Sequence, residues 1–304
     1  MEGGISSSLG LRPADAFAAR LAQAEDARLA VVLGAFVADL HALIDTYAIT
    51  RSELHGVLLF ATEVGHACSD QRQEWALLAD VLGLTSGVEN QMSRRPVAAT
   101  PNTLPGPFYR ADAPRRRDGE SISLDQKGQP LTFRASVVDL DARPVPHAQI
   151  EVWQANADGI YENQAPDQQP EFNLRGIFRA NALGRATIRT VRPAGYAVPG
   201  DGPVGQLMAR LAISLIRPAH IHVRITAAGF QPLTTHVFDR SDPALDQDPL
   251  FAVHPQLLAD FTPAEPGTRG GANAPVPHWC AEHRFTLAPT APDAAPDTAD
   301  AQAD

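Results

Sequence analysis

The sequence lacks the features that mark secreted and membrane proteins. Only two cysteines, Cys68 and Cys280, occur in 304 residues, and they lie far apart, so a disulfide framework is not expected and a reducing compartment is indicated. No apolar run approaches the roughly 20 residues that a membrane span needs. The first residues, MEGGISSSLGLRPADAF, lack a basic start followed by an apolar core, so no secretory signal is expected. We therefore expect a cytoplasmic protein without a membrane span.

Basic residues are also scarce. Lys and Arg number 25 against 35 Asp and Glu, and the resulting net charge of −10 argues against nucleic acid as a partner. Part of this charge lies in the last segment, APDAAPDTADAQAD, whose Ala, Pro and Asp bias predicts a disordered acidic tail over residues 291–304. The chain is long enough for one large or two ordinary domains.

The first 100 residues carry a helical pattern. Over residues 29–47 the apolar positions follow a spacing of three and four, which predicts a helix with one buried face. Thr50 and Glu53 have the spacing of a capping box at the start of a further helix. Asp70 and Gln73 repeat this spacing, which predicts another helix start.

After the Pro-rich segment ATPNTLPGP the pattern changes to period two with frequent turn residues, which predicts β-strands. The expected strands are residues 131–138, 148–154, 185–191, 220–227 and 233–238, with one short helix over 202–213. Several strands without long helices between them indicate a β-sandwich. The predicted fold class is therefore α+β, with a helical domain over residues 1–100 followed by a β-sandwich domain over residues 101–290.

One stretch of the second half groups residue types that bind metal ions. Tyr161 and Tyr196 stand beside turn-forming residues, which predicts that they lie in loops at the rim of a sheet. His220 and His222 are two apart in an expected strand, so both imidazoles face the same side. Two imidazoles and two phenolates would suit one cation. The residues alone also allow an ordinary pair of polar strand residues and two tyrosines that anchor sandwich corners.

The ligand types favour a hard, highly charged ion. Zinc sites usually contain thiolates, imidazoles or a carboxylate, and ferrous oxygenase sites contain two histidines and one carboxylate. Phenolate is a hard anion and an attested iron ligand. Two phenolates would therefore stabilise a trivalent ion.

Longer motifs surround these residues. LLFATEVGHACSDQRQEWALLADVLG, LPGPFYRADAP, AQIEVWQANADGIYENQ, GYAVPGDGPVG and RPAHIHVRITAAGFQPLTTHVF follow one another over nearly the whole chain. On these motifs the chain resembles the intradiol ring-cleavage dioxygenases, which include the catechol, chlorocatechol and hydroxyquinol 1,2-dioxygenases. The resemblance implies an enzyme of aromatic catabolism that inserts both atoms of O2 into a ring with two adjacent hydroxyl groups.

The resemblance assigns roles to individual residues. The positions that match the four protein ligands of the family's ferric ion are Tyr161, Tyr196, His220 and His222. Tyr196 also matches the tyrosine that leaves the metal and takes a proton from the substrate, which implies a catalytic role. Arg217 matches the arginine that stabilises negative charge on the ring, and its alternative role is a structural ion pair.

The resemblance also predicts the lining of a substrate pocket. The matching positions are Leu77, Asp80, Leu104, Pro105, Gly106, Pro107, Phe108, Val198, Pro199, Arg217, His236 and Leu250. Asp80 bears on the substrate, because hydroxyquinol and chlorocatechol members have an acid there, and its carboxylate could accept a hydrogen bond from a third hydroxyl. Its alternative role is that of a solvated helix residue. His236 stands where catechol-type members often have Gln, and it is expected to touch the substrate or support a ligand.

We therefore predict an Fe(3+) intradiol dioxygenase that converts hydroxyquinol (1,2,4-trihydroxybenzene) to maleylacetate, a tautomer of 3-hydroxy-cis,cis-muconate. Pro105 departs from the hydroxyquinol pattern and residues 267–285 match poorly, so a catechol or chlorocatechol 1,2-dioxygenase giving cis,cis-muconate is the alternative. A non-catalytic β-sandwich binding module is the alternative from another class. The resemblance further implies a homodimer through the helical domain and a bound phospholipid.

Overall fold

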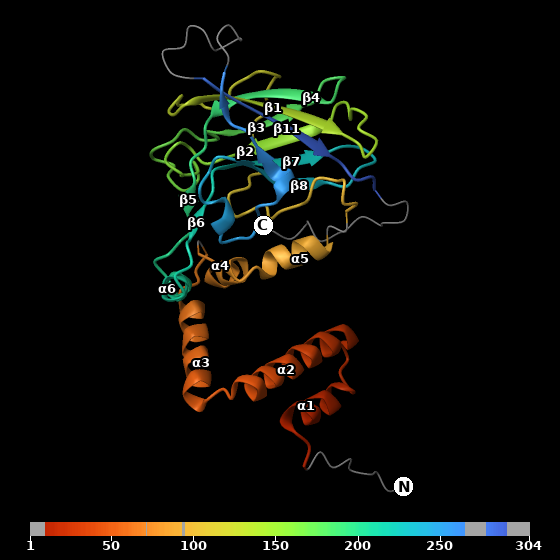
Figure 1. Cartoon of the computed structure of the whole chain (residues 1–304), viewed down its shortest axis with the longest axis vertical. Helices are drawn as coiled ribbons and strands as arrows, with labels where there is room; N and C mark the ends of the chain where they lie inside the picture. Colours follow the sequence, from red (N-terminus) through yellow and green to blue (C-terminus); the bar gives the residue numbers. More distant parts are fainter. Residues whose placement is uncertain (1–9, 71, 93–94, 265–277, 291–304) are drawn as a thin grey trace. The chain divides into compact units, whose positions relative to one another are not determined.

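The computed structural model describes residues 10–70, 72–92, 95–264 and 278–290, and the chain divides into two compact units, residues 1–66 and 67–304 (Figure 1). The predicted tail, residues 291–304, lies outside the described residues. The described part of the first unit contains the helices α1 (Pro13–Leu21), α2 (Ala27–Tyr47) and α3 (Arg51–His66). The helical pattern of this region is thus confirmed.

The capping box predicted at the start of α3 is confirmed. The backbone N–H of Thr50 donates to Oε2 of Glu53 over 2.8 Å, and the backbone N–H of Glu53 donates to Oγ1 of Thr50 over 3.2 Å. These reciprocal bonds satisfy N–H groups that the first turn of a helix leaves unpaired. α2 begins in a related way, because Asp26 accepts a hydrogen bond from the N–H of Leu29 at 2.8 Å.

The apolar face of α2 is exposed within the single chain, so the prediction that this face is buried is wrong for the isolated chain. Phe36, Leu40 and Leu43 expose 58%, 43% and 48% of their surface. No residue of α2 is buried, because the other described helices of the first unit cover it only in part. The periodic pattern indicates the helix and its apolar stripe correctly, but it does not indicate what covers the stripe.

By length and composition alone, α2 is also long and apolar enough to cross a membrane, with 21 residues and a mean hydropathy of 1.8. The sequence expectation that no such run exists is corrected here. Asp39, His41 and Asp45 interrupt the second half of the helix. Core helices of soluble proteins meet the same criterion, so this composition does not by itself indicate a membrane protein.

The second unit contains the predicted β-sandwich. One sheet has the strand order β10 (Thr262–Pro263), β11 (Trp279–Thr286), β1 (Pro130–Val138) and β4 (Arg185–Val191). The other has the order β3 (Arg175–Arg179), β2 (Gln149–Trp153), β7 (His220–Thr226), β8 (Leu233–Asp239) and β9 (Leu258–Ala259). A small separate pair consists of β5 (Tyr196–Ala197) and β6 (Ile216–Arg217). The helical elements are α4 (Glu74–Val81), α5 (Leu84–Met92), α6 (Pro203–Arg210), η1 (Leu245–Gln247) and η2 (Pro255–Leu257).

Apolar side chains from the two larger sheets pack in one cluster between them. Phe133 of β1 and Phe285 of β11 belong to the same buried cluster as Ile150 of β2 and Ile221 of β7. The inward residues alternate with outward polar ones, which is the period-two pattern of a half-buried strand. The sequence predicts β1, β2, β4, β7 and β8 to within two residues, whereas it predicts neither β3 nor β11.

α4 and α6 are joined through a buried carboxylate. α4 begins at Glu74 without a capping bond from the side chain of Gln73, so the capping box predicted at Asp70 and Gln73 does not start this helix. Instead, Oε1 of Glu74 accepts a hydrogen bond from the backbone N–H of Val204 in the first turn of α6 at 3.1 Å, and Arg72 donates to Oε2 at 2.8 Å. A carboxylate at a helix N-terminus pairs with N–H groups that lack partners within the helix. The contact fixes the two helices beside each other.

The folded chain is expected to lose stability on mild acidification through His283 of β11. This side chain is 9% exposed, and burial lowers the pKa of its imidazole from 6.5 to about 4. The unfolded chain binds this proton below about pH 6.5, whereas the folded chain binds it only below about pH 4, so stability falls as the pH falls through that window. The loss at the acid end is about 3 kcal/mol, measured by urea unfolding at several pH values.

His283→Gln should flatten this part of the pH dependence. His55→Gln, a change at an exposed position of α3, serves as the matched control and should leave the dependence as it is in the wild type. An unchanged slope in His283→Gln would show that other groups cause the loss.

Candidate metal centre

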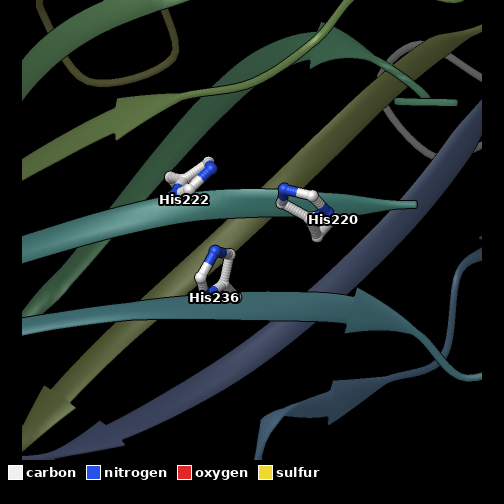
Figure 2. A group of neighbouring side chains, drawn as sticks. All are labelled: His220, His222 and His236. Atoms are coloured by element: carbon white, nitrogen blue, oxygen red, sulfur yellow. The ribbon is translucent and has the colours of Figure 1, made fainter. Parts of the chain in front are cut away.

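Three histidines stand together on β7 and β8. His220 and His222 are two residues apart on β7 and face the same side, and His236 of β8 lies opposite His222 in the antiparallel register. Figure 2 shows the three rings over these neighbouring strands. The ring centroids are 4.9 Å apart for His220 and His222, 4.2 Å for His222 and His236, and 4.9 Å for His220 and His236. One nitrogen from each ring lies within 4.8 Å of the others, so together they could hold a metal ion.

The two predicted tyrosines reach the same place from other segments. Tyr161 lies in the loop between β2 and β3, and its Oη is 3.4 Å from Nε2 of His220. Tyr196 forms β5, pairs with Arg217 of β6, and places its ring 5.6 Å from that of Tyr161. Gly159 makes this approach possible, because a Cβ there would lie 2.9 Å from Cβ of Tyr196. All four residues predicted as ligands are thus brought together, with His236 beside them.

Hydrogen bonds fix the orientation of two of the three imidazoles. Nδ1 of His220 donates to the carbonyl oxygen of Pro218 over 2.7 Å, and its Nε2 contacts Oη of Tyr161 at 3.4 Å. Nδ1 of His236 is engaged by the hydroxyl of Thr103, which leaves its Nε2 free. Nε2 of His236 and Nδ1 of His222 are buried and have no hydrogen-bond partner among the described residues. Buried nitrogens without partners are costly unless another group uses them.

Burial sets the protonation of the group. It is the main cause that lowers the pKa of His220, His222 and His236 well below the ordinary value, and the positive charge of Arg217 lowers it further. All three imidazoles are therefore neutral near pH 7 and keep a lone pair, which is the form that binds metal ions. Burial also raises the pKa of the Tyr161 hydroxyl, and the neighbouring Tyr196 adds to this effect. Only a strong cation would make Tyr161 an anion here.

Arg217 lies at the edge of the group and is 1% exposed. Its Nη1 is 3.4 Å from Oη of Tyr196, and its Nε donates to Oδ1 of Asp248 over 3.1 Å. Burial alone would lower the pKa of the guanidinium, but the negative charge of Tyr196 in its phenolate form and that of the Asp248 carboxylate raise it above its ordinary value. Arg217 is therefore a fixed, permanent cation. The predicted structural alternative, an ion pair, is thus present with Asp248, and it exists alongside the contact with Tyr196.

Aromatic rings form the walls around the group. Phe108, predicted as a substrate contact, stacks on Tyr161 with ring centroids 4.4 Å apart and an interplanar angle of 22°. Trp153, which was not predicted, stacks on His222 at 4.7 Å and 13°. Gly106 adopts φ of +71°, and a Cβ there would lie 3.6 Å from Cε1 of His222, so the backbone passes close to this ring. Such contacts restrict the rings to one orientation.

A buried ion pair supports the loop that carries Tyr161. Nε of Arg175 donates to Oε2 of Glu162 over 2.6 Å, and the two side chains are 1% and 3% exposed. Nη1 of Arg175 also donates to the carbonyl oxygen of Phe108. One guanidinium therefore joins the residue after Tyr161 to the segment that stacks on it. The sequence carries no signal for this pair.

Asp80 lies on α4 and is half-buried. Burial raises the pKa of its carboxyl, while a hydrogen bond from Thr85 and the charge of Arg217 lower it in part. The effect of Arg217 places Asp80 within electrostatic reach of the site. Leu250 follows η1 and is buried, and its carbonyl oxygen accepts a hydrogen bond from Ser86 at 2.6 Å.

The other predicted substrate contacts lie on three nearby stretches of the chain. Leu77 is half-buried on α4, Leu104 is buried and Pro105 and Pro107 are exposed in the loop before β1, and Val198 is buried and Pro199 exposed after β5. Their roles in the site stay predictions. The residues that the sequence did not indicate are Asp248, Thr103, Trp153, Glu162 and Arg175. The first three contact Arg217, His236 and His222, and Glu162 pairs with Arg175, which donates to the carbonyl oxygen of Phe108.

Comparison with known proteins gives concordant matches. The family described as "Dioxygenase" matches residues 104–288, and "Catechol dioxygenase N terminus" matches residues 26–100. A hydroxyquinol 1,2-dioxygenase of Rhizobium sp. (strain MTP-10005) is 40% identical over 281 residues, which cover 91% of this chain and 95% of the relative.

Solved structures agree with the sequence relatives. The hydroxyquinol 1,2-dioxygenase from Pseudomonas putida DLL-E4 superposes with a TM-score of 0.86 and 34% identity, over 91% of this chain and 97% of that one. The catechol 1,2-dioxygenase of Acinetobacter radioresistens gives a TM-score of 0.78 and 26% identity, over 95% and 96% of the two chains.

Proposed function

Because the chain belongs to the intradiol ring-cleavage dioxygenase family, we propose that it opens the ring of hydroxyquinol between the two adjacent carbons that bear hydroxyl groups. Both atoms of O2 enter the product, 3-hydroxy-cis,cis-muconate, which tautomerises to maleylacetate. The observation that carries the proposal is the group of Tyr161, Tyr196 and three buried histidines beside the Arg217–Asp248 ion pair. The two relatives named hydroxyquinol 1,2-dioxygenase support the choice of substrate.

The residues of the group fit a ferric ion held by Tyr161, Tyr196, His220 and His222. The histidines are neutral, and Nδ1 of His222 has no partner among the described residues, while Nε2 of His220 lies 3.4 Å from Oη of Tyr161. When bound, the ion supplies Lewis acidity that stabilises phenolate and diolate oxygens and makes the substrate ring reactive toward O2. The tyrosines account for a preference for a trivalent over a divalent ion, because two phenolates bring two negative charges.

The chain's own residues move one proton and stabilise one charge. Held as a phenolate by the ion, Oη of Tyr196 would accept a proton from one hydroxyl of the diol and become a neutral phenol, so no separate general base would be needed. Nη1 of Arg217 is 3.4 Å from this oxygen and remains cationic throughout, so it stabilises negative charge on the diol and its ring. Asp248 keeps the guanidinium in place through its bond to Nε. The stacked rings of Phe108 and Tyr161 exclude water from one side.

Asp80 supplies the preference for a third hydroxyl. Its carboxylate is half-buried on α4 and within reach of the charge of Arg217. A third hydroxyl on the ring would donate a hydrogen bond to it, whereas catechol would leave the carboxylate without that partner. Sites built to bind a hydroxyl discriminate strongly against the analogue that lacks it.

Oxygen uptake by the iron-loaded protein with hydroxyquinol, catechol and 4-chlorocatechol at equal concentration tests the proposal. We expect the highest rate with hydroxyquinol. Asp80→Leu should lower kcat/KM for hydroxyquinol by about 10² to 10³-fold and change that for catechol far less. Asp80→Asn keeps the shape of the side chain and should give an intermediate loss. A preference of the wild type for catechol would overturn the substrate while leaving the reaction, and no uptake with any of the three would overturn both.

The remaining features of the proposal concern assembly and location. We place the protein in the cytoplasm as a homodimer formed through the helical domain, with residues 1–100 as that domain and 101–290 as the catalytic domain. The exposed apolar residues of α2 support such a contact and a bound phospholipid, because large apolar surfaces of this kind are usually covered. Light scattering of the purified protein and lipid extraction would test these points.

A further inference from the structure

His236 is placed like a ligand although it is not one of the four predicted ligands. Its side chain is fully buried, with 0% exposure. Its ring lies 4.2 Å from that of His222 and 4.9 Å from that of His220, and its Nε2 has no hydrogen-bond partner among the described residues. The pairing of β7 with β8 explains the position, because His222 and His236 are direct cross-strand neighbours.

His236 also shares its mode of support with His220. In both residues Nδ1 is engaged, by the carbonyl oxygen of Pro218 in one case and by the hydroxyl of Thr103 in the other. Nε2 of His236 has no partner among the described residues, and Nε2 of His220 contacts Oη of Tyr161 at 3.4 Å. One nitrogen of each ring lies within 4.8 Å of those of the other two. Histidines that bind metal ions almost always use the second nitrogen in such a bond, which fixes the ring and the tautomer.

We propose that His236 is a third imidazole ligand of this site for divalent cations, so that Zn²⁺ or Cu²⁺ binds on the nitrogens of His220, His222 and His236. The inference rests on the proposed function only because it places a metal ion at the same site. It adds divalent cations to the ferric ion as a second class of ion that this site binds. A three-histidine set is an attested zinc site, and imidazole suits both ions. Binding through three neutral imidazoles releases no proton, whereas binding through a tyrosine requires the loss of one.

The consequence is competition between two kinds of ion for one set of histidines. Ferric iron uses the two tyrosines with two histidines, and a divalent ion uses three histidines and leaves the tyrosines protonated. Divalent ions are therefore expected to occupy the metal-free protein and to block its loading with iron. The residue at position 236 then sets the affinity of the site for the divalent ions that compete with iron.

Counting the nitrogens around Cu²⁺ tests the inference without any assay of activity. The full-length protein, freed of metal with a chelator, is given one equivalent of Cu²⁺, and electron spin echo modulation reports the number of coordinated imidazoles. We expect three in the wild type and two in His236→Gln. Zn²⁺ affinity, measured by competition with a coloured chelator, should fall more than about 100-fold in His236→Gln, because loss of a merely supporting residue costs 10 to 100-fold.

Matched variants separate this result from a loss of folding. His283→Gln replaces another buried histidine whose Nε2 has no partner, on the other sheet, and it should keep the wild-type affinity and the count of three. Thr103→Val removes the support of His236 and should weaken Zn²⁺ by 10 to 100-fold. If His236→Gln does not fold, the count in the wild type decides alone.

Two results would overturn the inference: two imidazoles around Cu²⁺ in the wild type, or a Zn²⁺ affinity of His236→Gln within about threefold of the wild type. Oxygen uptake by the ferric wild type is measured separately. Uptake with only two imidazoles around Cu²⁺ would reject the role of His236 and keep the proposed function. Three imidazoles around Cu²⁺ without oxygen uptake by the ferric protein would keep the role of His236 and reject the proposed function.

Discussion

Tyr161→Phe is expected to weaken and shift the visible absorption of the iron-loaded protein, because Tyr196 would remain as the single phenolate, and to lower turnover of hydroxyquinol by at least about 10³-fold. The absorption arises from phenolate bound to ferric iron, and the variant deletes the one oxygen that Tyr161 brings to the group, 3.4 Å from Nε2 of His220. Phe keeps the ring and therefore its stack on Phe108. The loss would thus come from the missing ligand oxygen and not from a cavity. Absorption spectra, bound iron and oxygen uptake are measured on the same sample.

Tyr109→Phe is the matched control for this prediction. Tyr109 packs against Trp153 in the same aromatic cluster, but its hydroxyl donates to Glu151 over 2.8 Å and accepts a hydrogen bond from Arg224. Removing that hydroxyl should cost about 1 kcal/mol of stability and leave both the colour and the reaction in place. Full activity and colour in Tyr161→Phe would contradict its assignment as a ligand.

Local sequence patterns account for most of the fold. Thr50 and Glu53 meet through a three-residue spacing, so their capping box can be recognised without knowing the rest of the chain. The strands with strict alternation, such as β1 and β4, are predicted for the same reason. β11 is not predicted, although its buried and exposed residues also alternate, and its partner β1 lies nearly 150 residues earlier in the chain, with Arg134 opposite Glu282. Parallel pairing over such a separation has no local signature.

The exposed face of α2 shows the limit of periodicity. A stripe of apolar residues predicts that a surface is covered, but the covering element can belong to the same chain or to another molecule. Phe36 and Leu40 are exposed in the single chain even though the spacing is that of a core helix. The same pattern therefore gives the right helix and the wrong burial.

The residues of the site also fall into those that a local sequence pattern predicts and those that it does not. The alternation of a strand predicts that His220 and His222 share a face, and the structure confirms this. The residues that hold the site residues in place could not be found in this manner, because each lies far from its partner in sequence. Thr103 meets His236 from 133 residues away, and Asp248 meets Arg217 from 31 residues away. Only the folded chain brings these pairs together.

Asp248→Asn is expected to lower the free energy of unfolding by about 3 to 5 kcal/mol, because it breaks an ion pair whose partners, Arg217 and Asp248, are 1% and 2% exposed. Oδ1 accepts from Nε of Arg217, and Oδ2 accepts from the backbone N–H of Ala252 over 3.0 Å. An amide has only one acceptor oxygen, so one of these donors would face an N–H group. The buried guanidinium would then lack a counterion.

The same change should lower kcat/KM by about 10²-fold, since a guanidinium displaced by about 1 Å no longer meets the developing charge. Urea unfolding and oxygen uptake measure the two effects. Asp260→Asn serves as the control, because it breaks an ion pair between exposed side chains, Arg240 at 52% and Asp260 at 68% exposure. This change should alter the free energy of unfolding by less than about 1 kcal/mol. The double variant Arg217→Met, Asp248→Leu removes both charges and should recover most of the stability without recovering activity. If it regained activity as well, Arg217 would be structural, and the charge on the ring would have to be stabilised by another group.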